Sequence, residues 1–432
     1  MQIKNSALSA LGQRTQDPPI SWLMALALAR PGLISLAAGF TDNESLPVRE
    51  VRRLFNDLLR TPQTGQAALQ YGTTAGDPEL RRLTAAWVRA ADRGPAQSRA
   101  YDPRRLMITS GSQQFLYMVT EALCDVGDIV LVEDPTYFVY LGLLQSHGLR
   151  ACGVRLEADG LDLAHLESVL TGLRRSGELR RVKLLYLVSY FQNPTGATTS
   201  AAKKRAILDL LRQYERAAGH PIYLFEDAAY RELRFAGADE PSALRFPGGA
   251  ERVIYGGTYS KPFSTGIRVG FGLLPAALHP VVMRLKGNHD FGTSNLLQQI
   301  LVRALASGRY AAHLEVLRRR YARKAEVVLA ALREHFPPAA EWWTPRGGLY
   351  VWARLPRRLR SGPRSPVFQS ALRRGVLYVP GVWCYADDPT RRKPDHEMRI
   401  SYGCVTETHL QTGIARLGKV LRDLMKPSRR AA

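Results

Sequence analysis

Short apolar runs alternate with amphipathic stretches between about residues 104 and 275. Each run has the length of a buried strand, whereas 113–123 and 201–218 carry the helical spacing of apolar residues, with Ser200 or Thr199 as a cap for the second. Strands and helices that alternate in this way predict an α/β fold with a mostly parallel central sheet covered by helices. The expected strands are 106–109, 129–132, 184–188, 222–225, 253–255 and 269–273.

The last part of the chain has a different pattern of apolar segments. Two further strands are expected at 348–355 and 398–402, followed by a final amphipathic helix. At 432 residues the chain is too long for one ordinary domain of roughly 100–200 residues. We therefore expect a large domain over 61–310 and a smaller α/β domain over 311–432, which the N-terminal segment 1–60 joins.

The apolar run 20–29 is the only early segment that resembles a targeting or membrane sequence. It is shorter than the roughly 20 residues that cross a bilayer. It has the length of a signal-peptide core, but Asp17-Pro18-Pro19 precedes it. The better interpretation is a short buried helix ended by Pro31-Gly32.

The net charge of +22 comes from 60 basic and 38 acidic residues. Such an excess is typical of proteins that bind nucleic acid or anionic membranes. The basic residues are nevertheless scattered along the whole chain, so we expect neither partner. The four cysteines are widely spaced and form no metal-binding pattern, which favours a cytoplasmic protein without a metal.

Candidate ligand-binding residues follow the apolar runs, because ligands of open α/β sheets bind beyond the carboxyl ends of the strands. Ser112 and Gln113 begin a helix after a glycine turn, where free N–H groups and the helix dipole can hold a phosphate. Asn193 stands in a rigid Pro-Thr-Gly turn. Asp227 ends an apolar run, where an ionised carboxylate needs a cation nearby. Each feature alone is as readily an ordinary turn or helix cap.

Lys261 follows a glycine-rich apolar run, which is an unusual place for a side chain that is normally solvated. Taken together, the features are far more specific than any one of them. Asn193, Asp227 and Lys261 follow each other at intervals of 34 residues, with Tyr230 three residues after the aspartate and Arg268 seven after the lysine.

This set resembles the class I and II aminotransferases of pyridoxal 5′-phosphate (PLP) fold type I. The segments 31–39, 70–72 and 134–137 resemble the branch of 2-aminoadipate and kynurenine aminotransferases. The resemblance covers nearly the whole chain. It implies PLP as the cofactor, an L-amino acid and a 2-oxo acid as substrates, and a homodimer with shared active sites.

The resemblance also implies roles for individual residues. Lys261 is expected to form a Schiff base with the cofactor aldehyde, which requires a deprotonated amine, and then to move the proton at the substrate Cα. Asp227 is expected to keep the pyridine nitrogen protonated, so that the ring accepts electrons. Asn193 and Tyr230 are expected to bond the ring hydroxyl oxygen, and Tyr137 to stack on the ring.

Two further groups of residues follow from the resemblance. Arg399 matches the arginine that clamps the substrate α-carboxylate with a bidentate fork, and Gly39 and Asn193 complete the substrate site. Tyr71 matches a tyrosine that reaches the phosphate of the neighbouring subunit. The remaining expected phosphate ligands are Ser112, Gln113, Thr258, Ser260 and Arg268.

Two departures from the family pattern bear on the substrate. Relatives specialised for a second carboxylate often carry an arginine in the first helix, but the matching stretch 21–24 reads Ser-Trp-Leu-Met. This favours an apolar or aromatic side chain. Cys384 stands where relatives usually have phenylalanine, which either reshapes the substrate pocket or is a neutral exchange.

Two other functions stay open. The scaffold also supports β-elimination, decarboxylation, cyclisation or oxidation, because Lys261 and Asp227 serve all of these PLP reactions. The fold is also found fused to a DNA-binding domain in transcriptional regulators. Only about 20 residues precede the family-like region, which is too few for a helix-turn-helix module.

Overall fold

The computed structural model of the chain describes residues 7–426. Its centre is an eight-stranded sheet with the order β2-β9-β8-β7-β6-β3-β4-β5. The strands from β4 through β8 pair in parallel, whereas β9 runs antiparallel to both of its neighbours and β5 to β4. The prediction of a mostly parallel sheet is therefore confirmed. Its strands are β2 (Leu106–Thr109), β3 (Ile129–Asp134), β4 (Arg150–Glu157), β5 (Gly160–Leu161), β6 (Val182–Val188), β7 (Tyr223–Asp227), β8 (Val253–Thr258) and β9 (Gly270–Leu273).

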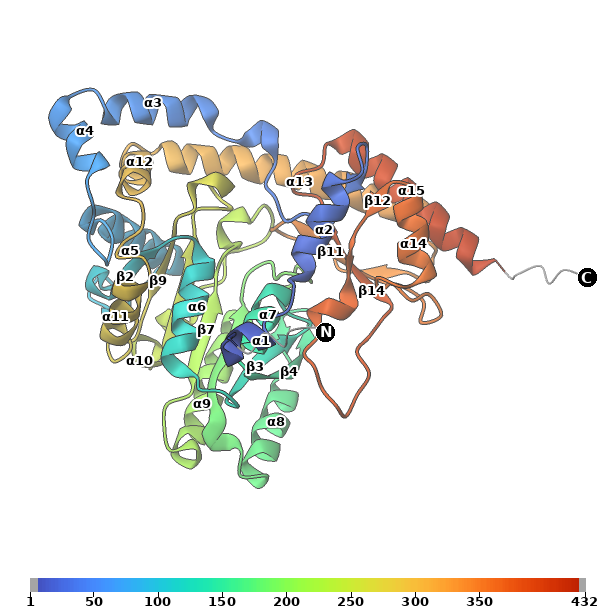
Figure 1. Cartoon of the computed structure of the whole chain (residues 1–432), viewed down its shortest axis with the longest axis horizontal. Coiled ribbons are helices and arrows are strands. Elements are labelled where there is room, and N and C mark those ends of the chain that lie inside the picture. Colours follow the sequence, from blue (N-terminus) through green and yellow to red (C-terminus); the bar gives the residue numbers. More distant parts are fainter. Residues whose placement is uncertain (1–6, 427–432) are drawn as a thin grey trace, which may run out of the picture.

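Helices cover this sheet, whose inner strands are buried on both faces (Figure 1). Burial on both faces explains why these strands read as continuous apolar runs rather than as alternating patterns. The side chain of Ser200 accepts a hydrogen bond from the Lys203 amide and caps α9, as one of the two predicted caps. The helices are α5 (Pro78–Asp92), α6 (Ser112–Leu123), α7 (Phe138–Ser146), α8 (Leu163–Arg175), α9 (Ala201–Ala218), α10 (Gly249–Arg252), α11 (His279–His289) and α12 (Asn295–Ala306).

A smaller four-stranded antiparallel sheet lies towards the C-terminus, in the order β10-β11-β14-β13. The long helix α13 packs on α12 at one end and on α15 at the other, so it connects the two parts (Figure 1). The elements are α13 (Arg309–His335), β10 (Glu341–Trp342), β11 (Tyr350–Arg354), α14 (Pro366–Arg373), β12 (Val376–Leu377), β13 (Val379–Pro380), β14 (Glu397–Ser401) and α15 (Glu407–Met425).

The N-terminal segment contacts both parts. Its strand β1 (Ile34–Ser35) pairs in parallel with β12, which supports the proposal that 1–60 joins a small domain over 311–432. Its helix α3 (Val48–Leu58), like the following α4 (Pro62–Leu69), packs instead on α12 of the proposed large domain over 61–310. The segment thus extends across the molecule, beginning with α1 (Ala10–Arg14) and α2 (Pro19–Leu28).

The prediction of a buried helix at 20–29 is wrong in one respect. Helix α2 forms, but Leu23 is its only buried residue and Leu28 is 80% exposed. The helix lies on the outside and packs on one side only, where Trp22 stacks on Phe368 and meets Trp383 edge-on. Because the run is apolar all round, its pattern cannot show which side faces the protein.

Candidate active site

A cavity of about 520 Å³ opens at the carboxyl ends of β6, β7 and β8. This volume lies within the range of small-molecule sites. Among the residues that the structure describes, no cluster of histidine, cysteine and carboxylate side chains could hold a metal ion. The sequence-predicted site residues that line the cavity are Gly39, Ser112, Gln113, Tyr137, Asn193, Asp227, Tyr230, Thr258, Ser260, Lys261, Arg268 and Arg399.

Tyr71 is the one predicted site residue that does not line this cavity. Its side chain is 83% exposed, and its ring contacts Phe291 edge-on at 5.5 Å. A role in a site formed with a second subunit would require this exposed position.

Lys261 lies three residues beyond β8, and its Nζ donates a hydrogen bond to the carbonyl oxygen of Gly39 at 2.6 Å. Burial lowers the pKa of this amine to about 8, and the positive charges of Arg399 and Arg268 add to the effect. A lysine that gives up its proton this readily is suited to attack a carbonyl group or to act as a base.

Asp227 is the last residue of β7 and is buried at the floor of the cavity. Its Oδ2 accepts a hydrogen bond from the Tyr186 hydroxyl at 2.8 Å, and its Oδ1 accepts one from the Ala229 amide at 3.0 Å. Burial raises the pKa of the carboxyl to about 6. Both partners are neutral dipoles, so this buried carboxylate is suited to hold a cationic group of a ligand.

An anion-binding corner forms where α6 begins. Gly111 precedes the helix with a φ of 76°, and a Cβ there would lie 2.6 Å from a terminal nitrogen of Arg268. A Cβ on Gly270 would lie 2.5 Å from the Ser112 amide nitrogen. The two glycines therefore let the arginine fork and the first amides of a 12-residue helix approach one another, an arrangement suited to phosphate.

Arg268 is held at this corner by its own backbone and by neighbouring hydroxyls. Its φ of 49° is in the left-handed region, which few arginines adopt. One terminal nitrogen donates to Ser260 Oγ at 3.4 Å, and the Ser260 amide donates to Thr258 Oγ1 at 3.0 Å.

Arg399 extends into the cavity from β14 and is only 2% exposed. One terminal nitrogen donates to Asn193 Oδ1 at 2.8 Å and the other to the carbonyl oxygen of Ala37 at 2.6 Å. Its buried Nε has no hydrogen-bond partner among the described residues. A buried guanidinium with an unsatisfied donor is suited to bind a carboxylate.

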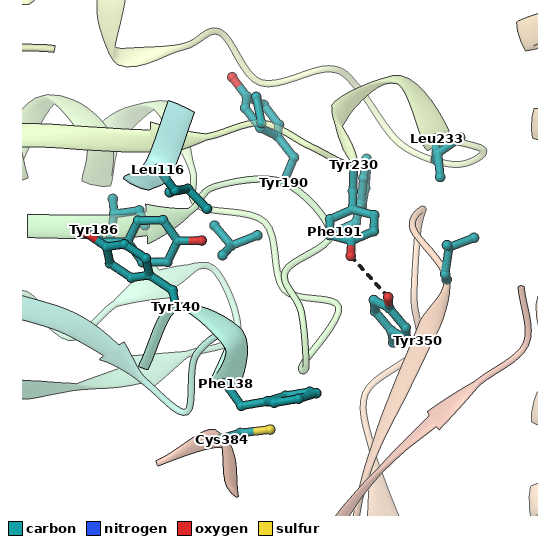
Figure 2. Packing of buried hydrophobic residues seen from close by; sticks show 14 of the residues in the cluster. Leu116, Phe138, Tyr140, Tyr186, Tyr190, Phe191, Tyr230, Leu233, Tyr350 and Cys384 are labelled. Carbon is teal, nitrogen blue, oxygen red and sulfur yellow. Dashed lines mark hydrogen bonds between the residues drawn. The ribbon is translucent and has the colours of Figure 1, made fainter. Parts of the chain in front are cut away.

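Two tyrosines belong to the site although the sequence did not single them out. Tyr186, in the middle of β6, donates to Asp227, and Tyr350 of β11 lines the cavity opposite Tyr230. Figure 2 shows the hydroxyl groups of Tyr230 and Tyr350 facing one another. A tyrosine inside the apolar run 184–188 was the available signal for Tyr186, whereas no local signal marks Tyr350.

Cys384 does not line the cavity. It is fully buried at the end of a 3-10 turn, Gly381–Cys384, which packs on α7. Figure 2 shows Cys384 beside Phe138, which does line the cavity. The exchange at position 384 can therefore act on a substrate indirectly, through neighbours such as Phe138.

The sequence profile described as "Aminotransferase class I and II" matches residues 31–417. The chain belongs to the class I and II aminotransferases. A 2-aminoadipate transaminase of Thermus thermophilus is 33% identical over 95% of this chain and 96% of its own length. Aromatic-amino-acid aminotransferase 1 of Thermococcus litoralis is 31% identical over 91% of this chain and 89% of its own.

A solved structure agrees with these relatives. The alpha-aminoadipate aminotransferase of Thermus thermophilus, complexed with N-(5′-phosphopyridoxyl)-L-leucine, superposes with a TM-score of 0.82 at 32% identity. The match covers 97% of this chain and 98% of that one. The expectation of PLP fold type I is thus confirmed.

The aminotransferase depends on PLP and moves amino groups between amino acids and 2-oxo acids. The cavity fits this cofactor, since it combines an anion corner at Arg268, a buried carboxylate at Asp227 and an amine of lowered pKa at Lys261. The other PLP reactions are not favoured by these relatives. No helix within 7–426 is both long and apolar enough to cross a membrane.

Proposed function

We propose that this aminotransferase prefers L-amino acids with apolar or aromatic side chains as donors to a 2-oxo acid. The supporting observation is the make-up of the cavity wall. Among residues 7–426, Lys261, Arg268 and Arg399 are the only cationic side chains that line this cavity. The part of the wall not involved in the anion corner or the carboxylate clamp includes Ile20, Met24, Phe40, Phe138 and Val139.

The proposed roles follow from the positions of the side chains. Bound PLP supplies a ring that accepts the electrons released when a bond at the substrate Cα breaks. Arg399 binds the substrate α-carboxylate through its open Nε and orients the Cα towards Lys261. The Lys261 amine removes and returns the Cα proton, for which a pKa of about 8 is well suited near neutral pH.

The cofactor-binding roles are proposed from the same geometry. Asp227 holds the ring nitrogen in its protonated form, and Asn193 and Tyr230 bond the ring hydroxyl oxygen. Tyr137 packs against the ring face. The proposed phosphate ligands are Ser112, Gln113, Thr258, Ser260 and Arg268, with Gly39 lining the substrate side.

We propose further that the enzyme is a cytoplasmic homodimer in which Tyr71 contributes to the neighbouring subunit's site. Tyr71 and Phe291 form an exposed aromatic pair, and Leu69 nearby is 68% exposed. Exposed apolar side chains that cluster in this way are typical of a surface that another protein subunit covers. The four cysteines are all free, which supports a reducing compartment.

Mixing a Lys261→Ala variant with a Tyr71→Ala variant tests shared sites, because hybrid dimers regain one intact site. No regain of activity after subunit exchange would contradict sharing.

Substrate preference is tested by a panel of amino donors with 2-oxoglutarate as acceptor, following the absorption change of the bound cofactor. We expect phenylalanine, tyrosine and leucine to exceed aspartate, glutamate and 2-aminoadipate in kcat/KM. Met24→Arg, which adds a cation to the apolar wall, should raise kcat/KM for 2-aminoadipate and lower it for leucine. Met24→Leu is the matched control. Faster turnover of the acidic donors by the unaltered enzyme would overturn the proposal.

A further inference from the structure

Tyr350 contacts three separate parts of the active site. Its hydroxyl oxygen lies 3.0 Å from the hydroxyl oxygen of Tyr230 (Figure 2). The guanidinium carbon of Arg399 lies 4.3 Å from the centre of its ring. A Cβ on Gly39 would come within 2.7 Å of the same hydroxyl oxygen. Tyr350 is buried. None of the sequence motifs contains it, so the family resemblance assigns it no role.

The hydrogen bonds around Tyr230 have a defined direction. Arg399 can only donate, so the Asn193 side-chain atom 2.8 Å from its terminal nitrogen must be the amide oxygen. The amide nitrogen of Asn193 therefore faces Tyr230, whose hydroxyl oxygen is 3.4 Å away and accepts the bond. The orientation of the Asn193 amide thus follows from the chemistry of its partner.

Tyr230 then has one lone pair and one proton left to use. If it donated its proton to Tyr350, it would have no donor left for a ligand in the cavity. If Tyr350 donates instead, both lone pairs of Tyr230 are occupied and its proton points elsewhere, into the cavity that it lines. The guanidinium of Arg399 lies over the Tyr350 ring and favours the second arrangement. When Tyr350 donates its proton, electron density increases on its oxygen and ring, and the positive charge stabilises that density.

We propose that Tyr350 is a positioning residue that directs the Tyr230 proton into the cavity, where it serves as the hydrogen-bond donor to the cofactor's ring oxygen. This inference rests on the proposed cofactor role of Tyr230. Donors in series strengthen one another, so Tyr350 makes Tyr230 a better donor than it would be alone. A donor to the ring oxygen draws electron density from the cofactor. The nitrogen through which the cofactor is joined to Lys261 then becomes less basic. Tyr350 therefore lowers the pH at which the bound cofactor titrates.

The test is a pH titration of the visible absorption of the holoenzyme and its Tyr350→Phe variant. Phenylalanine keeps the ring beneath Arg399 and removes only the hydroxyl. We expect the titration midpoint to move upwards by about 0.4 to 1 pH unit, the equivalent of one neutral hydrogen bond. We also expect kcat to fall a few-fold while KM for the amino donor stays within about twofold, since the contact with Arg399 persists.

A double-mutant cycle with Tyr230→Phe separates action through Tyr230 from independent effects. In the Tyr230→Phe background, Tyr350→Phe should no longer move the midpoint. The matched control is Tyr378→Phe, because Tyr378 is also a buried tyrosine whose hydroxyl donates one hydrogen bond, to the Ser361 carbonyl, but it lies outside the cavity. That control should lose stability without any shift of the midpoint.

Two results would overturn the inference: an unchanged midpoint in Tyr350→Phe, or an equal shift in both backgrounds. Failure of the proposed function would look different. In that case Tyr230→Phe alone would leave the titration midpoint of the holoenzyme unchanged, whatever residue occupies position 350.

Discussion

Replacing Lys261 by methionine should make the cofactor-free protein more stable at neutral pH. The pKa of the Lys261 amine falls from 10.5 to about 8, mainly through burial and secondly through Arg399 and Arg268. At pH 7 the folded chain therefore holds a positive charge that its surroundings disfavour. One pKa unit corresponds to about 1.4 kcal/mol, so the full cost is about 3 kcal/mol. Because the amine faces an open cavity where water screens part of the charge, we expect roughly 2 kcal/mol.

The sign of the pH dependence follows from which state binds the proton. Between about pH 8 and 10.5 the amine is neutral in the folded chain and protonated in the unfolded one. The unfolded state binds more protons there, so the stability of the unaltered protein rises with pH through this window. Methionine has about the same length and no charge, so Lys261→Met removes the penalty at pH 7 and with it this rise.

The measurement is denaturant unfolding of both cofactor-free proteins at pH 7, 9 and 10.5. The stability difference should be largest at pH 7 and close to zero at pH 10.5. Lys419→Met on α15 is the matched control, because Lys419 is exposed and its replacement should leave the pH profile unchanged. Equal stability of the two proteins at pH 7, or a difference that does not change with pH, would refute the reasoning.

Two further substitutions test the two ends of the cavity. Arg399→Lys keeps the charge but loses the planar fork that bonds Asn193 and Ala37, so kcat/KM should fall by roughly 10- to 100-fold. The factor should be similar for every amino donor, because all share the α-carboxylate; steady-state kinetics on several donors checks this, and a loss confined to one donor would contradict the assignment. Gly270→Ala places a Cβ 2.5 Å from the Ser112 amide, so it should displace the start of α6 and weaken cofactor binding roughly tenfold. Equilibrium dialysis measures that affinity, and unchanged binding would place the phosphate elsewhere.

The central sheet could be predicted from the sequence because its strands are buried on both faces. Continuous apolar runs then mark β2, β3, β6, β7, β8 and β9 closely, and the polar residues after them mark the site. Strand β4 was not predicted, because Val154 is its only fully buried residue and because Arg150 and Arg155 stand among its apolar residues. No apolar run distinguishes such a strand from a loop.

The contents of the cavity were less predictable where they depend on pairing between distant parts of the chain. Arg399 bonds Asn193 across 206 residues, and Tyr350 meets Tyr230 across 120. Family resemblance indicated both residues of the first pair. Tyr350 matches no motif, so only its position in the structure shows that it belongs to the site. The apolar side chains at positions 20 and 24 likewise reach the cavity only because α2 packs over it.

Strand β7 explains how the fold keeps one buried carboxylate available for a ligand. Glu226 and Asp227 are adjacent, so their side chains point to opposite faces of the sheet. Glu226 forms a fully buried ion pair with Lys204 at 2.8 Å and also accepts a hydrogen bond from the Ala243 amide. Asp227 faces the cavity, and its only hydrogen-bond partners among the described residues are the neutral donors of Tyr186 and Ala229.

Removing the partner of a buried charge costs several kcal/mol. Glu226 is therefore held in its ion pair with Lys204 and is not available to bind a ligand. Asp227 has no such partner to lose, and its burial is expressed as a raised pKa of about 6. A cationic ring nitrogen placed beside Asp227 would relieve that penalty. In the proposed cofactor role of Asp227, the free-energy cost of burying this carboxylate would be recovered when the cofactor binds. This accounts for the assignment of that role to the carboxylate without a charged partner rather than to Glu226.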